Sequence, residues 1–193
     1  RHVLGSRGLG DVYKRQEHKE EKIGGELIYQ GSIIRVEKHT VRMEDGSTAL
    51  REMVYHPGGV NVVALTPDRQ VYMVRQYRYP FGRMLLETPA GKLSPGEDPE
   101  TCGRRELEEE TGMQAKEFRF LGEFYPTVGY DTEVIYLYLA TGLTATHQHL
   151  DPDEFLDVEL FPLSQVVDWV MDGTIQDGKT QAAILKTARL LGI

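Results

Sequence analysis

Between residues 26 and 88, apolar and polar positions follow an extended pattern that is typical of β-strands. The segment 26–55 has apolar residues on both sides of a Glu-Asp-Gly turn signal at 44–46, so it predicts two extended segments. The residues His-Pro-Gly-Gly at 56–59 interrupt this pattern and predict a subdomain boundary. Three further strands are predicted at 60–65, 70–77 and 85–88.

The clearest helical pattern follows at 99–111. Asp98 can cap this helix, Pro99 suits its first turn and Gly112 suits its end. Strands are predicted at 117–125, 132–140 and 158–161, a polar loop at 141–153, and amphipathic helices at 162–171 and 179–191. This order predicts an α+β fold, an αβα sandwich around a mixed β-sheet with an N-terminal β subdomain.

Composition narrows the class of protein. The chain has 193 residues, of which 40% are hydrophobic, so it fits a globular domain with a small subdomain. A net charge of −8 argues against nucleic acid as a partner, although acidic clusters can hold metals that neutralise phosphates. The single cysteine, Cys102, excludes an internal disulfide and favours the cytoplasm. No apolar run is long enough for a membrane span, so no membrane partner is expected.

Residues 1–16 differ from the rest because they have no periodicity and no core-forming run. The stretch SRGLGDVYKRQ at 6–16 looks like one reading frame of a sequencing adapter, so 1–16 is expected to be a non-native tail. The alternative is a natural basic arm, since Arg1, Arg7, Lys14 and Arg15 are cationic. The expected organisation is then an N-terminal β subdomain at 17–56 and a main domain at 57–193.

A dense group of carboxylates marks the predicted helix at 99–111. Glu106 and Glu110 are four residues apart and stack on one helical face, and Glu109 is three residues from Glu106. Each exposed like-charge pair costs about 0.2–0.5 kcal/mol. A hard divalent cation relieves this repulsion, polarises phosphoryl oxygens and generates a nucleophilic water. Taken alone, the run is equally typical of a solvated helix face with mixed charges.

The residues that flank these glutamates favour the metal site. Residues 91–113 read GKLSPGEDPETCGRRELEEETGM, which is Gly, five residues, Glu, seven residues, then Arg-Glu-apolar-x-Glu-Glu-x-Gly-apolar. This spacing matches the Nudix box at every fixed position, so the chain resembles the Nudix hydrolases. The matching positions are Gly91, Glu97, Arg105, Glu106, Leu107, Glu109, Glu110, Gly112 and Met113.

The resemblance implies a role for each matched residue, with Mg²⁺ as the cofactor and Mn²⁺ as the alternative. Arg105 would orient the glutamates by ion pairs, while Gly91, Glu97 and Gly112 would shape the box. Catalytic roles are implied for Glu109, Glu154 and Arg105, of which Glu154 lies in an acidic loop. The implied metal ligands are the Ala90 carbonyl and the side chains of Glu106, Glu109, Glu110 and Glu154.

The likeness extends over 17–193 and points to the ADP-ribose pyrophosphatase subfamily. The segments that carry it are VRQYRYP at 74–80, LETPAGKL at 86–93, FYPTVGYDTEV at 124–134 and LDPDEFLDVEL at 150–160. The resemblance implies a homodimer built through the N-terminal segment, and hydrolysis of ADP-ribose to AMP and ribose 5-phosphate. The alternatives are a nucleotide-sugar pyrophosphatase acting on a substrate such as GDP-mannose, a non-catalytic ADP-ribose sensor, and an mRNA-decapping or oxidised-nucleotide hydrolase. The intact box and the lack of a basic surface disfavour the last two.

The implied substrate contacts are less specific than the box. Residues 75 and 78 are both arginines, but three positions along a strand put them on opposite faces, so only one is expected to reach the site. For each contact the alternative is an ordinary surface side chain. Val128 departs from the subfamily, which usually has proline at that place, and Ile33 stands where some relatives have Trp. The expected substrate contacts are Tyr29, Arg51, Arg75, Arg78 and Glu133.

Overall fold

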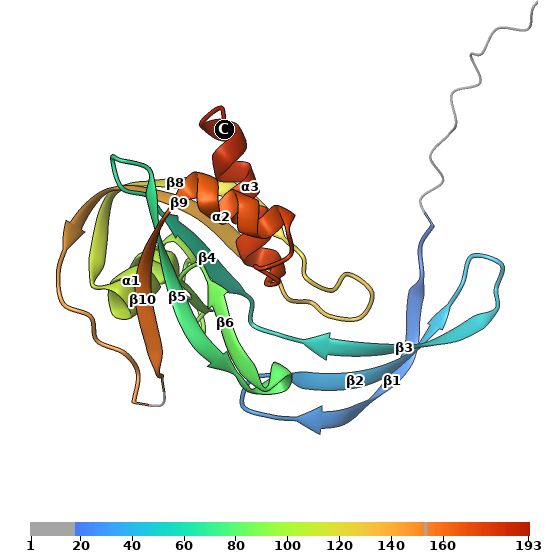
Figure 1. The fold of residues 1–193 in the computed structure, drawn as a ribbon. Helices are drawn as coiled ribbons and strands as arrows, with labels where there is room; N and C mark the ends of the chain where they lie inside the picture. The colour runs from blue at the N-terminus through green and yellow to red at the C-terminus, as the bar shows by residue number, and fades with distance from the viewer. Residues whose placement is uncertain (1–17, 153) are drawn as a thin grey trace, which may run out of the picture.

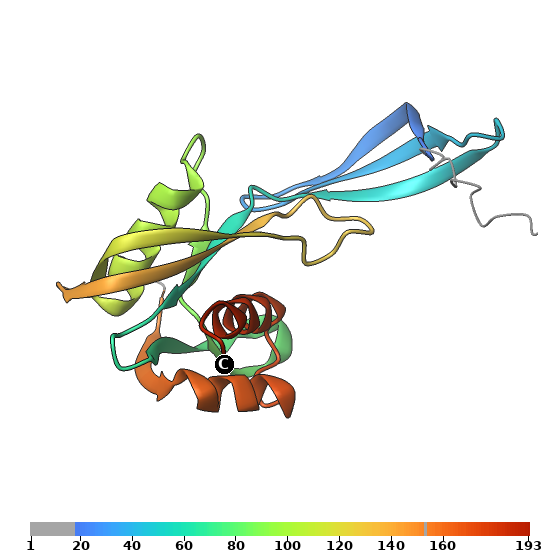
Figure 2. The ribbon, with the colours of Figure 1, turned by 90° about the horizontal axis from the view of Figure 1, so that it is seen from above.

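The computed structural model describes residues 18–152 and 154–193 (Figure 1), so the expected tail at 1–16 lies outside the described residues. The first three strands form an antiparallel sheet of their own, in the order β1-β2-β3. This sheet projects away from the rest of the described chain (Figures 1 and 2). Its strands are β1 (Glu21–Gln30), β2 (Arg35–Arg42) and β3 (Thr48–Tyr55).

The main body contains two further sheets. A four-stranded sheet has the order β7-β4-β9-β8 and is mixed, because β4 and β9 are parallel while the other pairs are antiparallel. A three-stranded antiparallel sheet has the order β10-β5-β6. The strands are β4 (Gly59–Ala64), β5 (Gln70–Arg78), β6 (Arg83–Glu87), β7 (Ala90–Lys92), β8 (Met113–Phe124), β9 (Ile135–Ala145) and β10 (Leu156–Pro162), with a short 3-10 helix η1 (Tyr79–Phe81) between β5 and β6.

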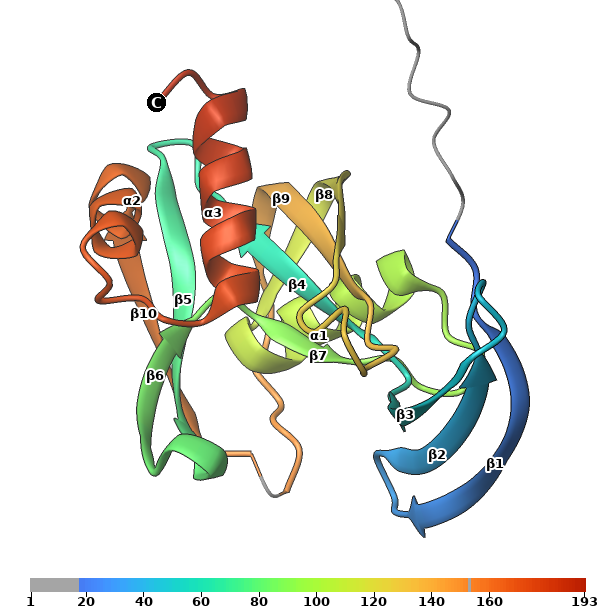
Figure 3. The same ribbon diagram turned by 90° about the vertical axis from the view of Figure 1, so that its right-hand side faces the viewer.

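Helices cover both faces of the four-stranded sheet. One apolar cluster joins β4 and β9 to α1 (Pro99–Thr111), with Cys102 and Leu107 fully buried. The other joins the same two strands to α2 (Leu163–Met171) and α3 (Gly178–Leu190), and Figure 3 shows α3 lying across the sheet. Burial raises the pKa of the Cys102 thiol to about 12, which suits a packing residue. The predicted αβα sandwich with a mixed sheet is confirmed.

Local signals fix the ends of α1. The Asp98 carboxylate accepts hydrogen bonds from the backbone N–H groups of Glu100 and Thr101, as an N-cap residue should. Gly112 ends the helix with a φ of 66°, a left-handed conformation in which glycine is favoured. These two residues set the register in which the glutamates of α1 face the sheet.

Two predictions about the strands were wrong. The segment before the turn at 44–46 holds two strands rather than one, β1 and β2. The polar loop expected at 141–153 begins later, because β9 continues to Ala145. Apart from Leu143, residues 141–145 are polar or small, and they pair with β8 as far as Met113. A strand end that buries little apolar surface has the composition of a loop. In residues 18–152 and 154–193, no helix has the length and apolar character of a membrane span.

We expect Leu107→Ala to destabilise the fold by about 2–5 kcal/mol, because its fully buried side chain pins α1 to the sheet. Urea unfolding followed by circular dichroism measures the change. Leu160→Ala, at a side chain that is 43% exposed on β10, is the matched control and should cost less than about 1 kcal/mol. Equal losses for the two variants would mean that Leu107 does not anchor the helix.

Candidate active site

The glutamates of α1 lie in different environments. Glu106 and Glu110, four residues apart, are buried with 7% and 1% of their surface exposed. Glu109 is partly buried and lies one residue away on the helix. Glu108 is also partly exposed, and its carboxylate accepts hydrogen bonds from Gln114. The predicted pair at positions 106 and 110 therefore faces the sheet.

Both buried carboxylates contact β7. The backbone N–H of Ala90 donates to Glu110 Oε2 at 3.0 Å. At Gly91, a Cβ atom would lie 1.9 Å from the carboxyl carbon of Glu106, closer than any side chain allows. Glycine is therefore required at position 91 because the Glu106 carboxylate occupies the space of its missing side chain.

Arg105 holds three glutamates together. Its Nε donates to Glu97 at 2.9 Å, and its Nη1 donates to Glu106 at 2.8 Å and to Glu109 at 2.7 Å. Glu97 also accepts from the backbone N–H of Ser94 at 2.9 Å, which ties the loop before α1 to the helix. Arg105 therefore joins the loop glutamate, Glu97, to two glutamates of α1.

Burial perturbs the two inward-facing carboxylates. Desolvation is the main cause that raises the pKa of Glu110 to about 8 and that of Glu106 to about 7. Arg105 partly offsets the effect on the pKa of Glu106. Among the described residues, Glu110 has the Ala90 N–H as its one hydrogen-bond donor, and the charge of Arg78 also lowers its pKa. Two neighbouring buried carboxylates with so little compensation fit a bound hard cation, which would stabilise their charged forms.

Other groups contribute to this region. The charge of Glu154 acts on both Glu106 and Glu110, so the acidic loop before β10 lies within electrostatic reach of α1. In the described parts of the chain, no three carboxylate, imidazole or thiol groups converge on one point. The residues that could hold a metal are Ala90, Glu106, Glu109, Glu110 and Glu154, the set that the resemblance to the family implies.

A buried ion cluster next to this region was not predicted as a unit. Glu87, at the end of β6, is 1% exposed and accepts from Arg78 Nε at 2.7 Å and Nη2 at 2.6 Å. Lys179 Nζ, near the start of α3, donates to Glu87 at 2.5 Å and pairs with Asp177 at 2.9 Å. Burial would raise the pKa of Glu87, but Arg78 and Lys179 together hold it below its usual value.

This cluster lies close to the helical glutamates, since the charge of Glu110 also acts on Arg78. Lys179 is the functional candidate that the sequence did not reveal. The Asp-Gly pair at 177–178 signals a helix start, and Asp177 does accept from the N–H of Thr180. No local pattern, however, reports a contact between Lys179 and Glu87, which are 92 residues apart.

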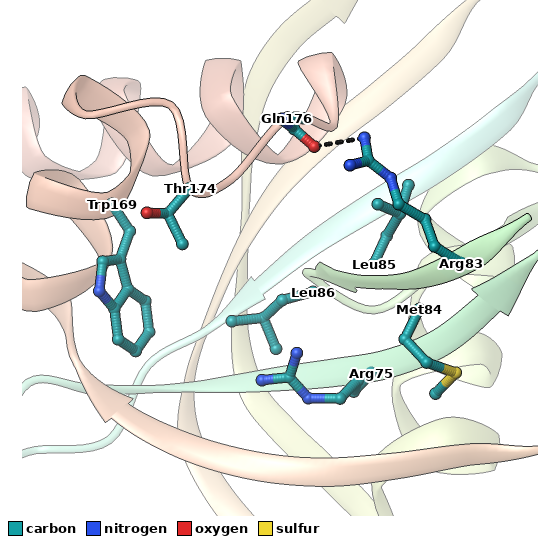
Figure 4. Close-up of a pocket in the computed structure, with 8 residues that line it drawn as sticks. All are labelled: Arg75, Arg83, Met84, Leu85, Leu86, Trp169, Thr174 and Gln176. Carbon is teal, nitrogen blue, oxygen red and sulfur yellow. Dashed lines mark hydrogen bonds between the residues drawn. The ribbon is translucent and has the colours of Figure 1, made fainter. Parts of the chain in front are cut away.

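The two arginines of β5 contact different groups, as their spacing predicts. Arg78 pairs with Glu87, while Arg75 Nε donates to Glu159 of β10 at 2.6 Å. Arg75 lines a pocket of about 210 Å³ (Figure 4). The figure shows its guanidinium near Leu86 and on the same side of the strands as Trp169. Arg78, rather than Arg75, therefore lies in the region of the α1 glutamates.

The remaining expected contacts lie on other elements. Glu133 Oε1 is 3.4 Å from His56 Nδ1, and burial raises the pKa of Glu133 although His56 opposes the shift. Arg51 on β3 pairs with Glu20 at 2.5 Å, and Tyr29 on β1 is 55% exposed. Within this chain, Arg51 and Tyr29 belong to the projecting sheet rather than to the surroundings of α1.

Comparisons with known proteins agree with this geometry. The profile of the family described as NUDIX domain matches residues 55–182. A methanol dehydrogenase activator of Bacillus methanolicus and an ADP-ribose pyrophosphatase of Bacillus subtilis (strain 168) are each 38% identical, over 86% of this chain and 91% of theirs. A GDP-mannose pyrophosphatase of Yersinia enterocolitica is 31% identical over 91% of this chain and 97% of its own.

A solved structure described as an ADP compounds hydrolase superposes with a TM-score of 0.81. It covers 90% of this chain and 95% of its own at 21% identity, so it supports the fold alone. The profile match and the relatives together show that this chain belongs to the Nudix family, whose members generally use divalent metal ions. The predicted family and fold are confirmed.

The ion pairs of Glu97 predict an acid-sensitive contribution to stability. Arg105 is the main cause that lowers the Glu97 pKa to about 2, below its value of about 4.3 in an unfolded chain. A lowered pKa stabilises the fold above about pH 4, and this stabilisation is lost as the pH falls towards 2. Glu97→Gln should therefore cost about 1–2 kcal/mol at pH 7 and progressively less from pH 5 to pH 3.

Denaturant unfolding of both proteins at several pH values measures this difference. A stability gap between wild type and Glu97→Gln that stays constant from pH 7 to pH 3 would show that the ionised Glu97–Arg105 pair does not support the fold.

Proposed function

We propose that this protein hydrolyses the pyrophosphate of ADP-ribose to AMP and ribose 5-phosphate, with Mg²⁺ as the cofactor. The observation that carries the proposal is the pair of buried carboxylates, Glu106 and Glu110, against the backbone of Ala90 and Gly91. The sequence similarity to relatives named ADP-ribose pyrophosphatase, at 35% and 38% identity, supports the choice of substrate.

The glutamates would hold the metal, and Arg105 would keep them in position. Glu106, Glu110 and the Ala90 carbonyl are the proposed principal ligands, with Glu109 and Glu154 as the more accessible carboxylates. When bound, Mg²⁺ polarises the phosphoryl oxygens and lowers the pKa of a bound water. Glu109 and Glu154 are proposed to act on that water, because neither is sealed in the core.

The substrate is proposed to extend from the glutamates towards the Glu87 cluster. The charge of Arg78 is only partly neutralised there, because Glu87 is shared between Arg78 and Lys179. The guanidinium of Arg78 therefore has N–H groups that can donate to a phosphate. Glu133 and the neighbouring His56 are proposed to contact the ribose. A nucleotide sugar such as GDP-mannose would use the same phosphate contacts, and the relative from Yersinia enterocolitica keeps this alternative open.

We further propose a homodimer that is formed through the projecting sheet and located in the cytoplasm. β1 is exposed along its whole length and carries large apolar side chains that nothing in the described chain covers. Exposed apolar surface of this kind is typical of an interface. Arg51 and Tyr29 belong to this sheet, so a partner subunit could bring them to the substrate. The exposed apolar residues of β1 are Ile23, Leu27, Ile28 and Tyr29, and Ile33, between β1 and β2, and Leu50, on β3, are exposed as well.

Glu110→Gln tests the proposed hydrolysis. The variant keeps the shape of the side chain but removes the anionic ligand, so turnover of ADP-ribose with Mg²⁺ should fall by about 10²- to 10⁴-fold. Glu108→Gln is the matched control on the same helix and should keep near-normal turnover, since its carboxylate is directed to Gln114 rather than to Glu106 or Glu110. Unchanged turnover in a folded Glu110→Gln variant would refute the metal role and would fit a non-catalytic sensor.

A substrate panel tests the leaving group. ADP-ribose, GDP-mannose and an ADP-sugar are supplied at equal concentrations with Mg²⁺, and products are identified by chromatography. The proposal predicts the highest kcat/KM for ADP-ribose, with AMP as a product. Efficient cleavage of GDP-mannose without cleavage of ADP-ribose would show that ADP-ribose is not the substrate. The proposed metal chemistry would then still hold.

The two arginines of β5 give a paired prediction. Arg78→Gln should raise the KM for ADP-ribose by about tenfold, the effect of losing one charge-assisted contact. Arg75→Gln should change KM by less than about twofold, because its guanidinium pairs with Glu159 in a different pocket. Steady-state kinetics measures both variants. A larger effect on KM from Arg75→Gln would show that the substrate enters the pocket that Arg75 shares with Trp169 of α2.

A further inference from the structure

A groove separate from the candidate active site lies between β8 and the second half of α3. Its volume is about 510 Å³, within the range of about 300–1,000 Å³ that is typical of small-molecule sites. β8 is the last strand of the four-stranded sheet, so no further strand covers that edge in the described chain. The α1 glutamates lie across the sheet, because α1 and α3 pack in different apolar clusters on it.

The lining of the groove is mainly apolar and unusually exposed. Leu185 and Leu190 on α3 are 39% and 46% exposed. Phe120 on β8 also borders the groove, but its ring packs against Tyr136 and Tyr138. Leu121 completes this surface from a partly buried position. Covering such a surface with a hydrocarbon chain is favourable, at about 25 cal/mol for each Å² of apolar area.

Three cations surround this apolar surface: Arg119, Lys186 and Arg189. Lys186 Nζ donates to the backbone carbonyl of Leu121 at 2.9 Å. Within residues 18–152 and 154–193, the side chains of Arg119 and Arg189 have no hydrogen-bond or ion-pair partner. In a chain of net charge −8, two arginines without carboxylate partners beside one apolar groove are suited to an external anion.

We propose that this groove binds a single molecule of an anionic amphiphile, with its alkyl chain on Leu121, Leu185 and Leu190 and its carboxylate or phosphate on Arg119 and Arg189. A guanidinium offers paired N–H donors that match both head groups. A volume of about 510 Å³ suits one monomeric ligand. The site does not depend on the proposed hydrolysis, since none of its residues belongs to the glutamate cluster.

Sodium decanoate below its micellar concentration is the first probe, titrated into the full chain and followed by amide NMR shifts. Binding should be saturable, with the largest shifts at 119–121 and 185–190. Affinity should rise by about two- to fourfold for each added methylene, as hydrocarbon burial predicts. Decyl phosphate should bind similarly, whereas decanol should bind about tenfold more weakly and decyltrimethylammonium should not bind.

Two double variants separate the groove from general charge effects. Arg119→Gln with Arg189→Gln should weaken decanoate binding by about tenfold and remove its advantage over decanol. Lys116→Gln with Arg69→Gln removes the same charge at exposed positions outside the groove and should change the Kd by less than about twofold. Leu185→Gln should weaken binding and reduce the dependence on chain length, while turnover stays unchanged.

Several outcomes would overturn the proposal. Shifts that spread over the whole surface, or equal affinity for decanol and decanoate, would show that no anionic site exists in the groove. Binding to vesicles of anionic phospholipid without saturable binding of monomeric decanoate would identify a membrane contact instead. An equal loss of decanoate affinity in the two double variants would show that binding depends on the net charge of the protein rather than on Arg119 and Arg189.

Discussion

The candidate active site depends on one costly arrangement, the burial of Glu106 and Glu110 against the strand that carries Ala90 and Gly91. Desolvation opposes the charged form of both carboxylates, and their proximity adds repulsion. A helix surface without a function would expose these side chains to water. The surrounding residues are arranged to keep them inward, since Leu107 anchors α1, Arg105 links the box glutamates and Gly91 makes room for a carboxylate.

The sandwich brings a second set of charges to the same region. Glu87 ends β6, Arg78 ends β5 and Lys179 starts α3, so three elements meet at one buried carboxylate. A buried carboxylate without a partner would strongly destabilise the fold. Two cations beside Glu87 stabilise its charged form in the core. Glu106 and Glu110 supply anionic groups to this region, while Arg78 and Lys179, which neutralise Glu87, supply cationic groups. A metal–pyrophosphate complex requires both kinds of contact.

The sequence predicted what depends on local chemistry. Asp98 and Gly112 signal the two ends of α1, and the spacing of the box is enough to place Glu106 and Glu110 on one helical face. The fold class followed from the order of the elements. The strand end at 141–145 could not be recognised, because its polar residues pair with β8 while burying little apolar surface. Long-range contacts were equally hidden: Lys179 meets Glu87 across 92 residues, and only tertiary packing brings them together.

The most direct test of the metal site is a titration of the purified chain with Mn²⁺, followed by the loss of the free-ion signal in electron paramagnetic resonance. Mn²⁺ accepts the same oxygen ligands as Mg²⁺ and can be counted. If Glu106 and Glu110 are buried to hold a metal, wild type and Glu108→Gln should bind the ion and Glu106→Gln with Glu110→Gln should not. Equal Mn²⁺ binding by all three proteins would contradict the assignment of the buried pair as the metal site.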